Sequence, residues 1–239
     1  MEPSGIIFAA LDCDADAIES WNRWYDLEHT PMNVCLDGVM LSRRYVATPE
    51  LHAARVAAAG SPFADGRSSF LTTYVLGGDP QIAFDAMSVE LPKLYGEGRM
   101  TFPVAKKVVR EGDVFAGTTA LGRPSLQLTA REVPFVGHVG VIVVQRRAVA
   151  GAPPDDRSAA VAELDGVTGV WSMESRNSPG LFLDLIFVED DPAARAVAIR
   201  EAVPHTTEVV VDAPYLLINP LSYPWAEAIR SSDLPKSVL

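Results

Sequence analysis

One order of secondary-structure patterns occurs twice along this chain of 239 residues. Apolar runs of strand-like period or length, with helical patterns between them, predict strand, helix, strand, strand, helix, strand in each half. The first half is expected to contain a strand at 5–13, a helix from the DCDAD run to Pro31–Gly38, strands at 40–48 and 69–77, a helix at 80–95 and a strand at 107–117. The second half is expected to contain strands at 135–147, 167–175, 180–189 and 208–219, with helices at 154–164 and 193–203.

Two local matches support a repeat. Leu36-Asp37-Gly38-Val39 and Leu164-Asp165-Gly166-Val167 both lie between the first helix and the second strand of their halves. Asp79-Pro80 and Asp191-Pro192 both open the second helix, where aspartate caps and proline fits the first turn. Each match alone is weak, because such residues are common at helix ends. The prediction of a repeat therefore depends on their occurring in the same order in both halves.

A strand, helix, strand, strand, helix, strand unit is the ferredoxin-like layout, in which both helices cover one face of a four-stranded antiparallel sheet. The uncovered face needs a partner, and a second copy of the unit supplies one. The sequence therefore predicts an α+β fold of two tandem ferredoxin-like units that form an α/β-barrel within one chain. The expected divisions are residues 1–121, a linker at 122–134, and a second, degenerate unit at 135–239.

Composition excludes several function classes. The net charge of −11 argues against nucleic-acid binding, which needs clustered cations, and against an anionic membrane surface. No apolar run approaches the length of a membrane-spanning helix, and the N-terminus lacks a signal-peptide pattern. The chain is expected to be cytoplasmic, with Cys13 and Cys35 as reduced thiols. No spaced metal-ligand pattern or glycine-rich phosphate loop occurs, so neither a metal nor a nucleotide is expected.

The two halves differ in where they carry extra chain. The first half is longer around its first helix, and it has a second insertion at 47–66 where the second half has only SRNSPG. This insertion is expected to contain a short helix and to cover the mouth of a pocket. Any functional site is therefore expected in the first half.

The stretch WNRWYDLEHTPM, residues 21–32, places aromatic and ionisable side chains on one helical face. With the α-helical period, Trp21, Trp24, Tyr25, Glu28 and His29 share an arc as wide as a buried stripe. A carboxylate and an imidazole on such a face need hydrogen-bond partners or a cavity. Pro31 is expected to end the helix and leave His29 near its C-terminus, where a proton is slightly stabilised.

The next strand supplies expected partners. Arg43 and Arg44 must point to opposite faces, and Tyr45 shares the face of Arg43. One arginine is expected to meet Glu28 in a bidentate ion pair, although periodicity leaves open which one.

The run Trp24-Tyr25-Asp26-Leu27-Glu28-His29-Thr30-Pro31, followed by Gly38 and Arg43-Arg44-Tyr45, resembles the dimeric α/β-barrel superfamily, nearest to its EthD-like members. The close match covers about 25 residues, and the repeated layout extends it loosely over both halves. Proteins of this superfamily include cofactor-free monooxygenases, lactone isomerases, polyketide cyclases, aldoxime dehydratases and haem-handling enzymes. The motif is missing from the second half, which departs from the symmetric homodimeric pattern.

The leading hypothesis is a small-molecule enzyme, of isomerase, cyclase or lyase type, with His29 as general acid or base in an apolar pocket. It would act on a hydrophobic or aromatic metabolite without a cofactor, and the tandem chain could itself form a homodimer. The expected catalytic residues are His29, Glu28, Arg43, Arg44 and Tyr45. The expected substrate-binding residues are Trp21, Trp24, Tyr25, His52 and His138.

Three alternatives remain open. The first is a cofactor-independent monooxygenase, and the second is a non-catalytic binder of hydrophobic small molecules. The third is a haem protein with His29 as ligand. Each residue also has a purely structural interpretation: a helix-ending histidine bonded to backbone, a structural ion pair of Glu28, and aromatic rings that form only core.

Overall fold

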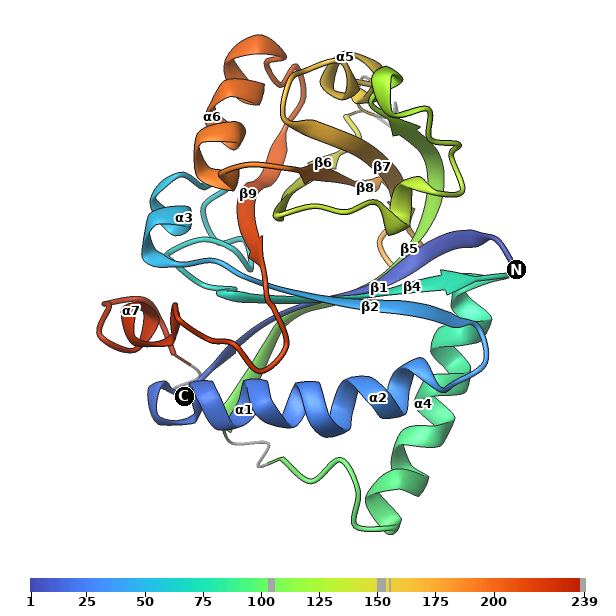
Figure 1. The fold of residues 1–239 in the computed structure, drawn as a ribbon, viewed down its shortest axis with the longest axis vertical. Helices are drawn as coiled ribbons and strands as arrows, with labels where there is room; N and C mark the ends of the chain where they lie inside the picture. The colour runs from blue at the N-terminus through green and yellow to red at the C-terminus, as the bar shows by residue number, and fades with distance from the viewer. Residues whose placement is uncertain (103–105, 150–153, 155, 237–239) are drawn as a thin grey trace.

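The computed structural model describes residues 1–102, 106–149, 154 and 156–236 (Figure 1). The elements of the first half are β1 (Pro3–Cys13), α1 (Ile18–Trp24), the π-helical turn η2 (Tyr25–His29), α2 (Thr30–Val34), β2 (Val39–Val46), α3 (Pro49–Ala53), β3 (Val56–Ala57), β4 (Phe70–Gly77), α4 (Pro80–Gly96) and β5 (Lys107–Gly122). Those of the second half are β6 (Gly140–Arg147), α5 (Ser158–Ala162), β7 (Val167–Ser175), β8 (Leu181–Val188), α6 (Pro192–Ala202), β9 (Val209–Leu217) and α7 (Ala226–Arg230).

The described strands form one antiparallel sheet that closes on itself. Neighbouring strands follow the order β2-β4-β1-β5-β7-β8-β6-β9, and β2 also pairs with β9. Within the part of the chain that the structure describes, eight strands therefore form a closed antiparallel barrel, and the fold is α+β. The helices lie outside it, with α1, α2 and α4 on the sheet of the first half and α5 and α6 on that of the second (Figure 1).

The inner faces of the strands share one apolar core. Alternate residues of each barrel strand point into the lumen, as expected for a pleated sheet with one face buried. The core includes Phe8, Tyr45, Leu71, Phe115, Val143, Met173, Leu183 and Tyr215, one from each of these strands. The outer faces form separate clusters beneath the helices, and the cluster under α1 contains Trp21, Trp24 and Tyr25.

The two halves repeat a close backbone contact. A Cβ on Gly5 would lie 2.1 Å from the carbonyl oxygen of Phe115 and 2.8 Å from Pro80. A Cβ on Gly140 would lie 2.3 Å from the carbonyl oxygen of Tyr215 and 2.5 Å from Pro192. The strand order is also the same in both halves, since the second, third, first and fourth long strands lie side by side.

Two expected boundaries change for a physical reason. β5 runs to Gly122 rather than ending at 117, because its first part pairs with β1 and its last part pairs with β7. β6 begins at Gly140 rather than 135, because a 3₁₀ turn occupies Val133–Phe135. The helix expected at 154–164 is observed only as the shorter α5 (Ser158–Ala162), and residue 155 lies outside the described residues. The short α7, beyond the last expected strand, was not predicted.

The insertion between β2 and β4 closes the barrel rather than the mouth of the expected pocket. Its helix α3 was expected, but β3 was not, and β3 pairs with β9 just beyond the point where β2 leaves that strand. Leu51 and Phe63 of the insertion belong to the lumen core. The tyrosine hydroxyl of Tyr215 donates a 2.8 Å hydrogen bond to the carbonyl of Ser68. The insertion therefore completes the seam and plugs one end of the lumen.

Among the described residues, the structure contains no helix that is both long enough and apolar enough to cross a membrane.

The close contacts of Gly5 and Gly140 predict a matched pair of destabilised variants. Gly5→Ala and Gly140→Ala each press a methyl group against a backbone carbonyl that cannot rotate away, so each is expected to lower the free energy of unfolding by about 1–3 kcal/mol. Gly137→Ala is the control, because a Cβ there meets nothing within 4 Å. Urea denaturation of the three variants measures the difference. Equal stability of Gly140→Ala and Gly137→Ala would show that the close approach is absent.

Candidate functional site

The helix formed by α1, η2 and α2 packs an aromatic cluster against the outer face of the first-half sheet. Trp21, Trp24 and Tyr25 are buried, with exposed fractions of 0%, 8% and 3%. Trp21 packs edge-to-face on Tyr25 at 4.9 Å and on Phe70 at 4.8 Å between ring centroids. These rings are core in their own right, and they also form the wall on which His29 rests.

A π-helical turn at Tyr25–His29 sets the direction of the ionisable residues. The Thr30 amide donates to the Tyr25 carbonyl, five residues back, which widens the helix at this point. The helix then continues through Pro31 to Val34, so the expectation that Pro31 ends it is wrong. The wider turn tolerates the proline, which lies in the first turn of α2, where its missing N–H is not needed. π-turns of this kind occur frequently at functional sites.

The buried arginine beneath this helix is Arg44. Its guanidinium donates a 3.1 Å hydrogen bond to Asp26 and a 3.3 Å bond to the carbonyl of Asn22. It also lies 4.1 Å from the centroid of the Tyr25 ring. Asp26 in turn accepts hydrogen bonds from the Leu221 amide and the Tyr223 hydroxyl, which ties the C-terminal segment to the helix.

The expected ion pair between Glu28 and an arginine is wrong. Asp26 takes that place, because the widened turn rotates the residues after Tyr25 and leaves Glu28 exposed on the outer side of the helix. Neither Asp26 nor Asn22, a second contact of Arg44, was singled out from the sequence, although both lie within one helical turn of the aromatic residues.

His29 is half-buried and packs against two rings. Its ring centroid lies 4.7 Å from that of Trp24 and 4.4 Å from that of Tyr25. Its Nδ1 is buried without a hydrogen-bond partner among the described residues. Burial, reinforced by the positive charges of Lys107 and Arg44, lowers the pKa of His29 to about 3. This is the reverse of the proton stabilisation expected at a helix end, and it leaves a neutral imidazole at neutral pH.

Lys107 is a cation beside Trp24 and close to His29, and it was not predicted from the sequence. Its ammonium lies 4.9 Å from the centroid of the Trp24 ring, and burial lowers its pKa. It stands at the start of β5, opposite Cys13 of β1, so no local pattern in the sequence connects it with the helix. Phe102 adds another ring at 5.4 Å from Trp24.

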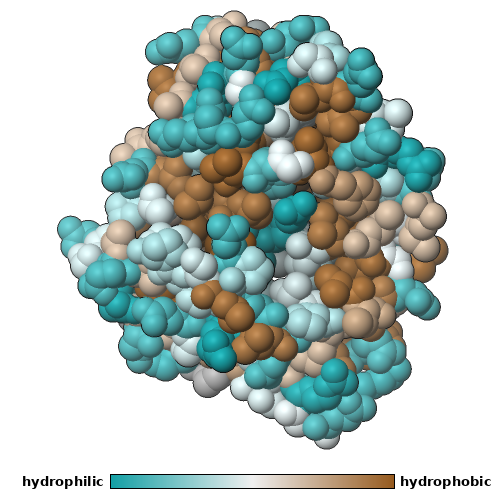
Figure 2. Space-filling view, in the orientation of Figure 1, coloured by the Kyte–Doolittle hydropathy of each residue, from teal (hydrophilic) through white to brown (hydrophobic). Residues whose placement is uncertain are grey.

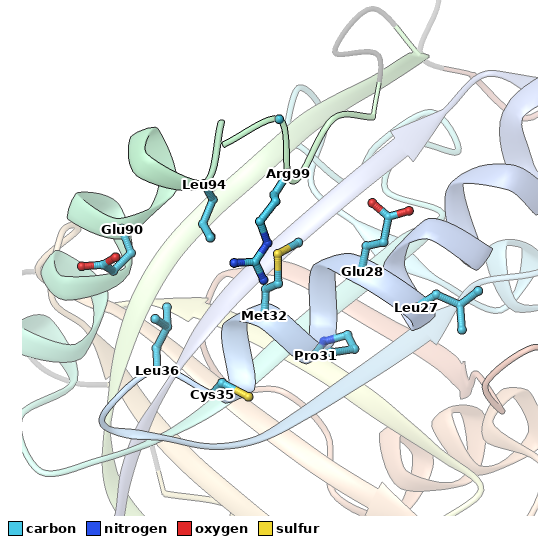
Figure 3. Close-up of a pocket in the computed structure, with 10 residues that line it drawn as sticks. Leu27, Glu28, Pro31, Met32, Cys35, Leu36, Glu90, Leu94 and Arg99 are labelled. Atoms are coloured by element: carbon cyan, nitrogen blue, oxygen red, sulfur yellow. The ribbon is translucent and has the colours of Figure 1, made fainter. Parts of the chain in front are cut away.

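A groove lies beside His29, between α2 and α4. Its volume is about 670 Å³, and its lining residues are Leu27, Glu28, Pro31, Met32, Cys35, Leu36, Glu90, Leu94, Gly98 and Arg99. Met32 and Leu94 face each other across the groove, and Arg99 extends toward Met32 (Figure 3). Both apolar residues pack against the aromatic cluster, so the groove adjoins the wall that holds His29.

The groove exists because α4 leaves the sheet. Within α4, only Pro80 and Ala83 near the N-terminus are buried, and the rest of the helix projects away from the barrel (Figure 1). On β5, Gly112 leaves space beside the strand, because a Cβ there would meet only Val109, at 3.7 Å. Val109 is 55% exposed, an unusual value for a valine on the covered face of a sheet.

β2 divides the predicted site residues into two groups. Arg44 faces the helix, whereas Arg43 and Tyr45 face the lumen, where the Tyr45 hydroxyl meets His138 Nε2 at 3.1 Å. Arg43 and Arg44 point to opposite faces, as expected, and Tyr45 shares the face of Arg43. The expectation that Tyr45 and His138 lie in the same pocket as His29 is wrong, because both belong to the lumen side of the sheet. His52 belongs to neither group, since it bonds Ser69 at 3.1 Å within the insertion.

The surroundings of His29 do not fit a haem. A haem ligand must present a free ring nitrogen to a slot that accepts the porphyrin plane. Here the imidazole packs against Trp24 and Tyr25, and it is not among the residues that line the groove. Among the described residues, no group of three or more histidine, cysteine, aspartate or glutamate side chains is arranged to hold a metal ion.

No protein-family model matches the sequence, and no curated protein shows significant similarity to it. Solved structures do share its fold. A dye-decolorizing peroxidase from Bacteroides thetaiotaomicron aligns over 97% of this chain and 96% of its own, with a TM-score of 0.54 and 7% identity. A candidate chlorite dismutase aligns over 95% of this chain and 99% of its own, with a TM-score of 0.53 and 10% identity. At these identities the likeness concerns the fold alone.

The Arg44–Asp26 ion pair predicts a large effect on stability. Both side chains are only 6% exposed, and Asp26→Asn would leave the Arg44 charge buried without compensation. The expected loss is about 3–5 kcal/mol of unfolding free energy. The control Glu28→Gln, on the same helix but exposed, is expected to change it by less than about 0.5 kcal/mol. Chemical denaturation compares them, and a larger loss in the Glu28 variant would contradict this assignment.

The buried histidines predict that acid destabilises the protein. Burial, as the largest cause, lowers the pKa of His29 to about 3, His52 to about 2 and His138 to about 4. The unfolded chain therefore takes up these protons near pH 6.5, well before the folded protein does. Burial raises the pKa of Glu111 to about 7, which opposes the trend by one proton.

Stability is thus expected to fall as pH drops from about 6.5 to 5, with a slope approaching about 2.7 kcal/mol per pH unit for two net protons. His29→Asn should reduce this slope by about one proton. Urea unfolding at several pH values measures both slopes. A slope that stays the same in His29→Asn would mean that His29 titrates normally in the folded protein.

Proposed function

We propose that this protein is a small-molecule enzyme of the dimeric α/β-barrel superfamily, in which His29 acts as a general base beside the groove between α2 and α4. The reaction is of isomerase, cyclase or lyase type. The observation that carries the proposal is a neutral imidazole with an unpartnered buried nitrogen, set among aromatic rings and close to cations.

The architecture supports the superfamily assignment. We infer two tandem ferredoxin-like units, EthD-like in the first half, from the strand order common to both halves and from the matching contacts of Gly5 and Gly140. In this arrangement one chain supplies both halves of a barrel that a homodimer would otherwise form. The expected cytoplasmic location and the homodimer of the tandem chain stay predictions.

The electrostatics around His29 favour removal of a proton from a substrate. A neutral imidazole accepts a proton from an activated C–H or O–H bond, and the bonding electron pair remains on the substrate as an enolate or phenolate. Burial is the largest cause of the low pKa of His29, and the charges of Lys107 and Arg44 lower it further. A substrate anion formed near those cations would offset their effect and raise the pKa of His29 as the proton transfers.

Lys107 is the residue best placed to stabilise the anion. Its ammonium lies against Trp24, on which His29 also packs, whereas the charge of Arg44 is already paired with Asp26. Return of the proton from His29 to another substrate atom completes an isomerisation. Expulsion of a leaving group by the same electron pair completes an elimination.

The residues that line the groove favour a hydrophobic or aromatic substrate. Leu27, Met32, Leu36 and Leu94 supply apolar surface along the groove, and Trp24 lies behind it. Glu28, expected among the catalytic residues, lines the groove together with Arg99. Glu28 and Arg99 can bind polar groups of a substrate but cannot orient the imidazole.

Proton exchange tests the proposal without a known substrate. The full-length protein is incubated in deuterium oxide with 2-tetralone, a ketone with a weakly acidic C–H bond, and exchange is followed by NMR. The wild type is expected to accelerate exchange, and His29→Ala to lower the rate by about 10²–10⁴-fold. Free imidazole should restore part of the rate in His29→Gly, which a purely structural histidine would not allow.

Arg23→Gln is the matched control, because Arg23 is exposed on the same helix and should leave the rate unchanged. A folded His29→Ala protein that exchanges as fast as the wild type would refute the role of His29. Binding of the ketone without exchange would favour the non-catalytic binder, and oxygen consumption would favour the monooxygenase.

A further inference from the structure

A second polar cluster lies on the lumen side of β2, away from the groove. The Tyr45 hydroxyl and His138 Nε2 are 3.1 Å apart, and His138 Nδ1 lies 2.8 Å from the Val136 carbonyl oxygen. Arg43 shares the inward face with Tyr45 and stands opposite Thr73 of β4. Because Arg43 and Tyr45 come from the first half and His138 from the second, the cluster spans both.

The hydrogen-bond geometry fixes the direction of the protons. A carbonyl oxygen only accepts, so Nδ1 of His138 carries the proton and donates it to Val136. Nε2 then has a free lone pair, and the Tyr45 hydroxyl donates to it. Burial, partly offset by the Val136 bond and reinforced by Arg43, lowers the pKa of His138 to about 4, so the ring is neutral. Tyr45 and His138 therefore satisfy each other and leave the charge of Arg43 uncompensated.

The side chain of Arg43 has no partner, unlike those of three other buried or partly buried arginines. Arg44, Arg146 and Arg200 each pair with an aspartate, at 3.1 Å, 2.5 Å and 2.8 Å. Among the described residues, the side chain of Arg43 makes neither a hydrogen bond nor an ion pair, and its Nε is buried without a partner. An uncompensated, partly buried charge costs stability, so its presence calls for a group from outside the chain.

The surroundings of the Tyr45–His138 pair are largely apolar. His138 packs on Phe187 at 4.9 Å and stacks on Tyr45 at 5.8 Å between ring centroids. Leu41 and Val136 are partly buried against the lumen core. Phe135 and Val139, which flank His138 in the chain, are 38% and 43% exposed. Figure 2 shows hydrophobic residues gathered near the centre of this face, where the chain leading into β6 crosses in Figure 1.

We propose that this end of the barrel binds a small carboxylate with an apolar body, held by the guanidinium of Arg43 beside the Tyr45–His138 pair. The carboxylate would accept two parallel hydrogen bonds from the guanidinium fork. The apolar body would pack against Phe187 and the exposed side chains near His138. The site does not depend on the groove or on His29, because the sheet separates the two.

Benzoate is the probe, and benzamide, of the same shape without charge, is the control ligand. Titration calorimetry on the full chain is expected to give a dissociation constant of roughly 1 mM or tighter for benzoate, and much weaker binding of benzamide. Arg43→Met should weaken benzoate binding at least about tenfold, while the ligand-free melting temperature stays the same or rises. Arg43→Lys, which keeps the charge but loses the fork, should bind benzoate with intermediate affinity.

His29→Ala should bind benzoate like the wild type, which separates this site from the groove. Equal benzoate affinity in Arg43→Met and wild type would overturn the proposal, as would equal affinity for benzoate and benzamide. A large fall in the ligand-free melting temperature of both Arg43 variants would also overturn it, since Arg43 would then be a structural residue.

Discussion

Closure of the barrel along β2 is the constraint on which the rest of the structure depends. β2 meets β9 only where Tyr45 lies opposite Leu217 and Val46 lies opposite Leu216, and β3 continues the pairing along β9. Closing the sheet removes the exposed edges that two separate four-stranded sheets would have. Closure also buries one face of every strand in a common lumen. The residues that face the lumen must therefore be apolar, and those that face outward must pack against the helices. The insertion of the first half is part of this seam, which explains why the second half needs no equivalent.

Because β2 is a wall between two compartments, its neighbouring arginines have different environments. Arg44 points under the α1 helix, where Asp26 neutralises it and Tyr25 covers it. Arg43 points into the lumen beside a neutral tyrosine–histidine pair. Two consecutive residues of β2 therefore differ in role, since Arg44 forms a structural ion pair and Arg43 is a cation without a compensating charge. The groove owes its existence to a different element, since α4 departs from the sheet after Ala83 and leaves room beside Met32.

Much of the fold could be predicted from the sequence, because its main signals depend on residues that are close together in the chain. These signals are the helical and strand periods and the Asp-Pro and Asp-Gly pairs at the ends of elements. The strand predicted at 167–175 is observed with the same bounds, since a largely buried run of strand-forming residues indicates a strand strongly. The site was harder. A straight α-helical period placed Glu28 and His29 on one face, but the π-turn moved Glu28 outward. The sequence did not show that Arg43 and His138 share the lumen whereas Arg44 faces the helix, because this depends on how the strands pair around the closed barrel. Lys107 was not predicted, because the residues that it contacts are distant in sequence.

We infer that the sheet separates the groove beside His29 from a lumen site that contains Arg43 and His138. The most direct measurement is a nitrogen NMR spectrum of the histidine rings in one sample, recorded while benzoate and then 2-tetralone are added. We expect benzoate to shift the signals of the His138 ring nitrogens and to leave those of His29 unchanged, and we expect the ketone to do the opposite. Shifts of both histidines with either ligand, or of neither with both, would contradict it.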